Sequence, residues 1–134
     1  EISNPDIVTT YINEAKDNIV IQSDAHNLKQ LIWIFAENGI KYSREEQCHI
    51  TIKVGYNNDN KPYFSVSDNG IGIEKDAFNK IFDRFYRYDE SRNKKIEGNG
   101  LGLSIAKSIS KKINSVITVD SEIGKGSTFT VTFK

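Results

Sequence analysis

The alternation of apolar and polar positions predicts most of the strands. Residues 48–54 alternate as a half-buried strand does, the polar run 57–60 follows as a turn, and residues 63–66 alternate again. This pattern indicates a hairpin. Shorter strand patterns lie at residues 8–12, 18–22, 116–119 and 128–133, and the last two are joined by a glycine-rich turn at 124–127.

A helical period governs residues 25–42, after a good N-cap at Ser23 or Asp24. At about 100° per residue, one stripe of this helix is predicted to face the core. That stripe holds Leu28, Leu31, Ile32, Phe35, Ala36 and Gly39. One flank holds Ile34, Asn38, Lys41 and Tyr42, whereas Trp33, Glu37 and Ile40 point largely away.

Two further helices are expected, a short one at 74–82 and a longer one at 100–113. The inward positions of the longer one are Leu101, Ile105, Ile109 and Ile113. Helical patterns together with mostly hairpin-linked strands predict an α+β fold, a two-layer sandwich of a mixed β-sheet and three main helices. Residues 1–134 form one domain, in which residues 1–18 are expected to be the remnant of a cut fragment with the first strand.

The composition of the chain disfavours several classes of function. Lysine plus arginine balances aspartate plus glutamate at 18 each, so no basic surface is expected and a nucleic-acid partner is disfavoured. The longest apolar run, residues 31–36, is too short to span a bilayer, and no direct membrane contact is predicted. The single cysteine, Cys48, is expected to be a buried structural thiol, and His26 and His49 lack the spacing of a metal pair.

The sequence SDNGIGI, residues 67–73, carries the first chemical signal. Asp68 follows a strand pattern and is predicted at the floor of a pocket, where Gly70 and Gly72 let the backbone approach a ligand. An ionised carboxylate only accepts hydrogen bonds, so it pairs with an exocyclic amine such as that of adenine and repels the carbonyl of guanine. The alternative is an ordinary surface turn, which the apolar neighbours Ile71 and Ile73 disfavour.

A second glycine cluster opens the last helix. Gly98, Gly100 and Gly102 alternate there, which frees backbone amides at a helix start to face phosphates. Residues 88–98 before it are mostly polar and include several basic side chains, as expected of a lid that orders over a nucleotide.

The order of five motifs resembles the ATP-binding catalytic domain of bacterial two-component sensor histidine kinases, in the GHKL ATPase superfamily. The motifs are ENGIKYS (37–43), SDNGIGI (67–73), IFDRFYR (81–87), GNGLGLSIAK (98–107) and GKGSTF (124–129). The resemblance covers residues 23–134 and implies the Bergerat fold of that superfamily.

The resemblance implies a function and a set of residues. The domain would bind ATP and Mg²⁺ and supply the γ-phosphate to a histidine on a separate dimerisation domain of the same or a sister chain, upstream of a response regulator. It would be a cytoplasmic domain of a membrane-anchored sensor kinase, nearly inactive alone. Asn38 would contact Mg²⁺, and Asn38, Lys41 and Arg87 would serve transfer. The implied nucleotide contacts are Asn38, Lys41, Tyr42, Asp68, Gly70, Gly72, Ile73, Arg87, Gly98, Gly100, Leu101, Gly102 and Thr128.

Several alternatives stay open. A core position is the other interpretation of Tyr42, and a solvated side chain that of Lys41. Gyrase, MutL, heat-shock chaperones and anti-sigma serine kinases of the superfamily carry a glutamate base four residues before the asparagine, where this chain has Ile34. Many sensor kinases have a second asparagine there.

An aliphatic group cannot activate water or a serine hydroxyl, so an ATPase or serine kinase is disfavoured. Glu37 lies about 100° around the helix from Asn38 and is not a substitute. A nucleotide sensor with impaired transfer remains the second alternative.

Overall fold

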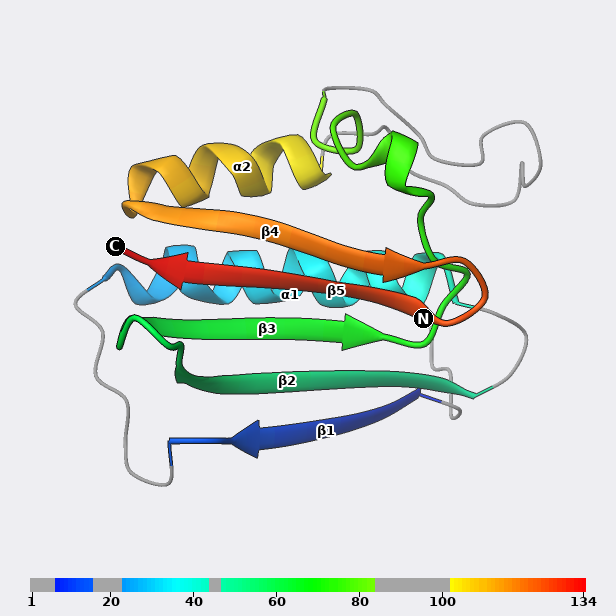
Figure 1. Cartoon of the computed structure of the whole chain (residues 1–134), viewed down its shortest axis with the longest axis horizontal. Helices are drawn as coiled ribbons and strands as arrows, with labels where there is room; N and C mark the ends of the chain where they lie inside the picture. Colours follow the sequence, from blue (N-terminus) through cyan, green and yellow to red (C-terminus); the bar gives the residue numbers. More distant parts are fainter. Residues whose placement is uncertain (1–6, 16–22, 44–46, 84–101) are drawn as a thin grey trace.

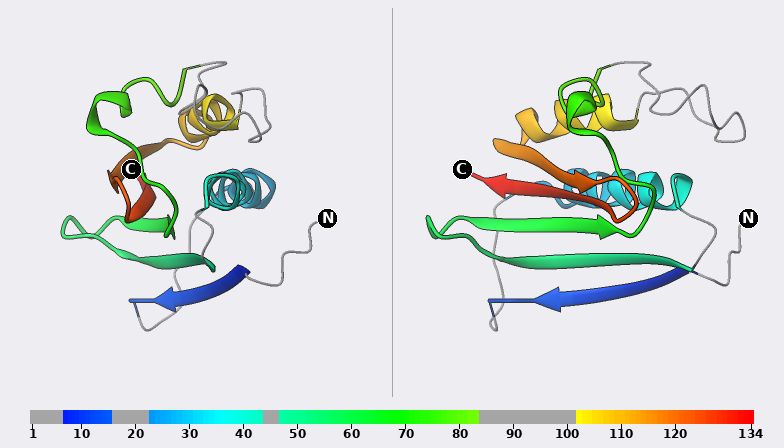
Figure 2. Two further views of the ribbon diagram at one scale, coloured as in Figure 1. Left: turned by 90° about the vertical axis from the view of Figure 1, so that its right-hand side faces the viewer. Right: turned by 45° about the vertical axis from the view of Figure 1, so that its right-hand side comes forward.

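The computed structural model describes residues 7–15, 23–43, 47–83 and 102–134, and shows a mixed sheet with helices on one face (Figures 1 and 2). The strands follow the order β1-β2-β3-β5-β4, with β1 parallel to β2 and the other pairs antiparallel. The strands are β1 (Ile7–Asn13), β2 (Cys48–Tyr56), β3 (Pro62–Asp68), β4 (Ser115–Glu122) and β5 (Gly126–Phe133). The helices are α1 (Ala25–Lys41) and α2 (Gly102–Lys112). The predicted α+β class and mixed sheet are confirmed.

Helix α1 begins where the sequence predicted. The carboxylate of Asp24 accepts a hydrogen bond from the backbone N–H of His26 at 2.9 Å, which satisfies one of the free amides of the first turn. The core stripe is confirmed by the burial of Leu31 and Phe35, and Trp33 is 59% exposed as expected. Ile40 was wrongly predicted to point away, since it is half-buried and packs against the core.

Aromatic rings join the two layers. The ring of Phe35 on α1 stacks on that of Phe129 on β5 with 4.8 Å between centroids and 7° between planes. Phe82 meets the same ring edge-on, at 6.2 Å and 90°. Phe129 is fully buried. The core therefore lies between α1, the middle of the sheet and the segment that contains Phe82.

The predicted helix at 74–82 is wrong in type. Only one 3₁₀ turn, η1 (Lys75–Ala77), forms there, and further turns follow it to Phe82. Ala77 and Ile81 are buried, and Phe82 packs on Phe129. Ile81 and Phe82 both reach the core from this segment, so their packing fixes its path, and a helical pattern of little more than two turns is too short to be stable without support from packing.

The inward face of α2 also differs from the prediction. Ile105 is 41% exposed and Ala106 is fully buried, whereas Ile109 is buried as predicted. A spacing of four residues advances about 40° per step beyond a full turn, so a stripe built on it drifts off the contact face. Leu101 and the predicted strand at 18–22 lie outside the described residues.

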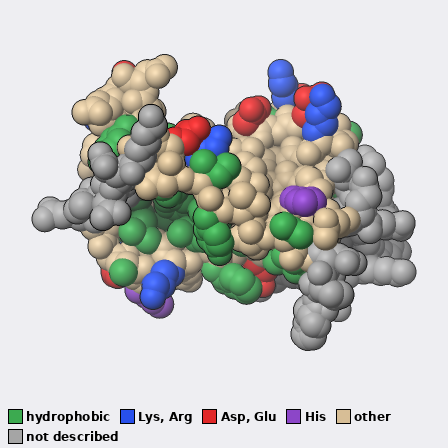
Figure 3. All heavy atoms as spheres, turned by 90° about the horizontal axis from the view of Figure 1, so that it is seen from below, with side chains coloured by type: hydrophobic (Ala, Val, Ile, Leu, Met, Phe, Trp, Pro, Cys, Tyr) green, Lys and Arg blue, Asp and Glu red, His purple; other side chains and the backbone are tan. Residues whose placement is uncertain are grey.

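No helix within the described ranges covers the edge of the sheet at β1 or the sheet face away from α1 and α2. Hydrophobic side chains gather in the middle of the face seen from below in Figure 3, and the exposed large hydrophobic residues include Tyr11 and Ile12 of the edge strand β1. On the sheet face away from the helices, the hydroxyls of Ser67 and Thr128 form a hydrogen bond at 2.8 Å. Within the described part of the chain, no helix has the length and apolar character needed to cross a membrane.

Candidate nucleotide site at the end of strand β3

Asp68 is the last residue of β3, and its side chain lies on the helix side of the sheet. The strand register pairs it with Ile50 of β2, which is buried in the core, and with Ser127 of β5. The end of α1 lies directly against it, because a Cβ on Gly39 would be 2.8 Å from the Cβ of Asp68. Only glycine fits at residue 39 without moving one of these elements.

The carboxylate of Asp68 is fixed by backbone donors. The N–H of Gly70 donates to Oδ1 at 2.8 Å, and the backbone N–H of Ser127 also donates to the carboxylate. Burial raises the pKa of Asp68, and these two hydrogen bonds oppose the rise. A carboxylate held in this way has a fixed orientation and keeps lone pairs that can accept from a ligand amine.

Cys48 belongs to the same environment without being reactive. It is 2% exposed, and burial together with the nearby charge of Asp68 raises the pKa of its thiol. A thiol is nucleophilic only as the thiolate, so Cys48 stays inert near neutral pH. This confirms its predicted place as a buried structural residue.

The loop after β3 is attached on both sides. The N–H of Ile71 donates to the carbonyl of Tyr42 at the end of α1, at 3.1 Å. On the other side, the N–H of Gly124 donates to the carbonyl of Ile71 at 2.9 Å, and the N–H of Ile73 donates to the hydroxyl of Ser121 at 2.7 Å. The loop is therefore held between α1 and the β4–β5 hairpin.

Close contacts within the protein account for the glycines of this loop. Gly72 has φ +82°, and a Cβ there would lie 2.2 Å from the carbonyl oxygen of Glu122. A Cβ on Gly70 would lie 2.6 Å from the carbonyl oxygen of Tyr42. Close approach of backbone to backbone thus requires glycine at both positions, where the sequence predicted close approach to a ligand.

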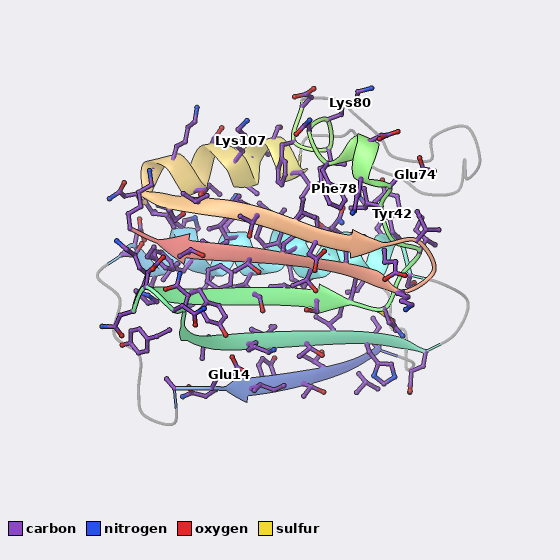
Figure 4. All side chains as sticks on the ribbon, viewed as in Figure 1. Glu14, Tyr42, Glu74, Phe78, Lys80 and Lys107 are labelled. Atoms are coloured by element: carbon purple, nitrogen blue, oxygen red, sulfur yellow. The ribbon has the colours of Figure 1, made fainter. Side chains whose placement is uncertain are left out.

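Three predicted residues lie at the end of α1 near Asp68. Asn38 is half-buried in the last turn, Lys41 is exposed, and Tyr42 is the half-buried C-cap. Figure 4 shows Tyr42 at the same end of the molecule as Glu74, which follows the loop. Asn38 offers an amide oxygen of the kind that a Mg²⁺ ion accepts beside phosphates and waters.

Ile34 stands at the position where related ATPases have a glutamate, and its side chain packs between helices. Ile34 is half-buried against the core, and a Cβ on Gly102, the first residue of α2, would be 3.8 Å from its Cγ2. The start of α2 therefore lies beside the flank of α1 that carries Asn38. The remaining predicted contacts, Arg87, Gly98, Gly100 and Leu101, lie outside the described residues.

The structure does not bring Thr128 to the side chain of Asp68. Its hydroxyl bonds to Ser67 on the opposite face of the sheet, and Ser127 is the residue beside Asp68. Sequence reasoning missed Ser127, although counting back two positions from the inward Phe129 would have found it.

Asn69 was missed as well. Its side chain accepts from the N–H of His49 and donates to the carbonyl of Gln47, both at 2.9 Å. It thereby continues the pairing of β3 with β2 where the backbone turns away, and helps to fix Asp68 next to it. No pattern in the sequence separates this asparagine from one in an exposed turn.

A half-buried acid at the end of a central strand, covered by a helix end and a glycine loop, is the arrangement expected of a nucleotide-binding domain of the ATPase type. Residues 23–134 match the family described as histidine kinase-, DNA gyrase B-, and HSP90-like ATPases, and the chain belongs to this family. Within it, the chain is the catalytic, ATP-binding type of domain found in sensor histidine kinases of the GHKL superfamily.

Curated relatives are sensor kinases of greater length. The chain is 41% identical over 118 residues to the sensor histidine kinase YkoH of Bacillus subtilis. The aligned residues make up 88% of this chain and 25% of YkoH. The chain is 39% identical over 121 residues to the signal transduction histidine-protein kinase ArlS of Staphylococcus haemolyticus, covering 90% of this chain and 26% of ArlS. The chain thus spans about a quarter of these relatives.

Solved structures share the fold. Full-length ShkA in complex with AMPPNP aligns with a TM-score of 0.79 and 26% identity, over 95% of this chain and 25% of ShkA. The catalytic domain of histidine kinase ThkA in a nucleotide-free form aligns with a TM-score of 0.74 and 22% identity, over 96% of this chain and 78% of ThkA.

Proposed function

We propose that this domain binds Mg-ATP and supplies the γ-phosphate to a histidine on a separate dimerisation domain, in the same or a sister chain. The observation that carries the proposal is the half-buried carboxylate of Asp68, fixed by backbone donors in the fold of an ATPase family. The complex of ShkA with AMPPNP, an analogue of ATP, supports the ligand class.

Recognition of the base follows from the chemistry of Asp68. Its carboxylate accepts the amino group of adenine, whereas guanine would place a carbonyl oxygen against the same negative charge. The hydrogen bond from Gly70 holds the carboxylate oxygen at 2.8 Å, so the acceptor is oriented before the nucleotide arrives. Pre-orientation of this kind lowers the entropic cost of binding.

The phosphate end would involve α1 and the start of α2. Asn38 would hold the Mg²⁺ ion that bridges the phosphates, and this ion neutralises charge that develops during phosphoryl transfer. Lys41, which is exposed and follows Asn38 in the last turn of α1, would reach phosphate oxygens, as would Arg87 by resemblance. Gly102 is the first described residue of α2, and the amides at the start of a helix are a favourable site for phosphate oxygens.

The reaction would depend on positioning and charge, because Ile34 stands where related ATPases have a glutamate. Without that base, the isolated domain is expected to bind ATP and to turn it over hardly at all. Ile34 also favours a second candidate, a nucleotide-binding sensor domain with impaired transfer, because it replaces a second asparagine of many sensor kinases. The same residue argues against a self-contained ATPase or serine kinase.

Calorimetry on this chain tests the first half of the proposal. ATP should bind in the presence of Mg²⁺, more weakly in EDTA, and GTP should not bind measurably. Equal affinity for ATP and GTP would contradict the role of Asp68. Rapid ATP hydrolysis by the chain alone would support the ATPase instead.

Transfer needs a second experiment with the dimerisation domain attached. With γ-labelled ATP, an acid-labile and alkali-stable label on a histidine of that domain is expected. ATP binding without any label would support the impaired sensor. By analogy with the relatives, the parent protein would be a membrane-anchored sensor with this domain in the cytoplasm, and its phosphohistidine would serve a response regulator.

A further inference from the structure

The side chain of Ser121 on β4 joins three segments at the candidate site. Its hydroxyl oxygen lies 2.7 Å from the backbone nitrogen of Ile73, 2.8 Å from the carbonyl oxygen of Gly126 and 2.8 Å from the hydroxyl of Ser127. Ile73 is in the loop after Asp68, and the other two residues begin β5. All three partners are buried.

The partners determine the direction of every hydrogen bond in this group. A serine hydroxyl has one proton and two acceptor sites. The N–H of Ile73 can only donate and the carbonyl of Gly126 can only accept, so the proton of Ser121 goes to Gly126. The hydroxyl of Ser127 must therefore donate to Ser121, which fills all three positions of the Ser121 hydroxyl.

The direction of the hydrogen bond from Ser127 to Ser121 affects the environment of Asp68. Ser127 faces Asp68 across the β3–β5 pair, close enough for side chains to interact. Because its proton is held by Ser121, the Ser127 hydroxyl does not compete with a ligand amine for the carboxylate. The loop that carries Ile73 is also fixed to the hairpin before any nucleotide binds.

We propose that Ser121 is a positioning residue for nucleotide binding, whose hydroxyl orders the loop at residues 70–73 and turns the Ser127 proton away from Asp68. This proposal rests on the proposed ATP function. Strand β5 separates Ser121 from Asp68 on β3, so Ser121 acts through Ile73 and Ser127. Without the hydroxyl, the N–H of Ile73 loses its acceptor, and the loop must be ordered at the moment of binding.

The chain offers a matched control at the other end of the same strand. Ser110 of α2 and Ser115 of β4 form a buried pair, with 2.7 Å between hydroxyls, and each also bonds to a backbone carbonyl of the other segment. Removing the Ser110 hydroxyl disturbs a buried network of the same chemistry. It does not touch the loop at 70–73.

The test compares Ser121→Ala, Ser121→Thr and Ser110→Ala by ATP calorimetry and thermal unfolding. Ser121→Ala should weaken ATP binding about tenfold, the ratio expected from one lost hydrogen bond to a buried donor. Ser121→Thr keeps the hydroxyl and should restore affinity to within about twofold, and Ser110→Ala should lower the unfolding temperature with ATP affinity unchanged within about twofold. The amide proton of Ile73 should move upfield in the NMR spectrum of Ser121→Ala and return in Ser121→Thr.

The outcomes distinguish failure of the ATP function from failure of the role of Ser121. If wild type fails to bind ATP, the proposed function is wrong. If wild type binds but Ser121→Ala binds equally well, or loses affinity only as much as Ser110→Ala, Ser121 is merely structural and the inference is overturned.

Discussion

Replacing Asp68 by asparagine tests the central contact of the site. Asparagine has nearly the same shape, and its remaining oxygen can still accept from the N–H of Gly70, which lies 2.8 Å from Oδ1 in the wild type. The other oxygen becomes an NH₂ group, which would face the amine of adenine donor to donor. The mutation thus changes charge and hydrogen-bond direction with little change in packing.

The expected magnitude follows from a lost charged hydrogen bond and a new unpaired donor. Together these cost about 3 kcal/mol of binding free energy, which is on the order of a hundredfold in Kd. Calorimetric titration with Mg-ATP measures it. Asp59→Asn, an exposed change in the β2–β3 turn at the other end of β3, is the control and should bind as wild type does.

Stability against pH gives an independent check on the same carboxylate. Burial raises the pKa of Asp68 in the folded protein above its ordinary value of 3.8, so the folded state holds this proton more tightly than the unfolded chain. The contribution of Asp68 to stability is therefore present at low pH and is lost as pH rises through that interval. Asparagine does not titrate, so the stability of Asp68→Asn relative to wild type should rise with pH there.

Unchanged ATP affinity in Asp68→Asn would refute the role of the carboxylate as the adenine anchor. A relative stability that does not vary with pH would show that folding does not raise the pKa of Asp68. Both results together would remove the basis of the site, whereas the first alone would leave the fold intact.

Other changes test the loop, the core and the far end of the sheet. In denaturant unfolding, Gly72→Ala should lower the free energy of unfolding far more than Gly124→Ala. Both glycines have a positive φ, +82° at Gly72 and +84° at Gly124, but only at Gly72 does a backbone atom lie 2.2 Å from the new Cβ. Gly124 has open space around it, so Gly124→Ala should cost only about 1–2 kcal/mol. Phe129→Ala should cost about 3–5 kcal/mol of unfolding free energy, and Phe129→Leu clearly less. The pKa of Tyr63 is raised from 10.0 to about 12 by a hydrogen bond to Glu14, by burial and by the charge of Glu14. The free energy of unfolding should therefore fall as the pH rises from 10 to about 12, and Tyr63→Phe should abolish that fall.

Much of the fold could be predicted because apolar spacing reflects burial directly. The alternation at residues 48–54 and 63–66 marks β2 and β3, and the structure extends each by a few residues, which makes Asp68 part of its strand. The period at 25–42 marks α1. The segment at 74–82 failed because tertiary packing of Ile81 and Phe82 overrides a helical pattern that is only two turns long.

The candidate site was less predictable than the fold, for two physical reasons. A one-residue difference in a strand moves a side chain to the other face, which separates Ser127 from Thr128. Hydroxyl networks leave no periodic signal, so the role of Ser121 becomes visible only when Ile73 and Gly126 are placed around it.

The flank of α1 gives a structural reason why the proposed ATP site would lack a base of its own. Asn38 and Ile34 lie one turn apart on the same side, and the first residue of α2 lies beside Ile34. A polar base at residue 34 would be half-buried between two helices and would need a partner of its own, whereas isoleucine packs there without one. Packing at 34 thus joins the helix that carries Asn38 to the helix whose N-terminus would face the phosphates. Ile34 supplies no base at that position, and under the proposed function the group that accepts the phosphoryl would belong to another domain.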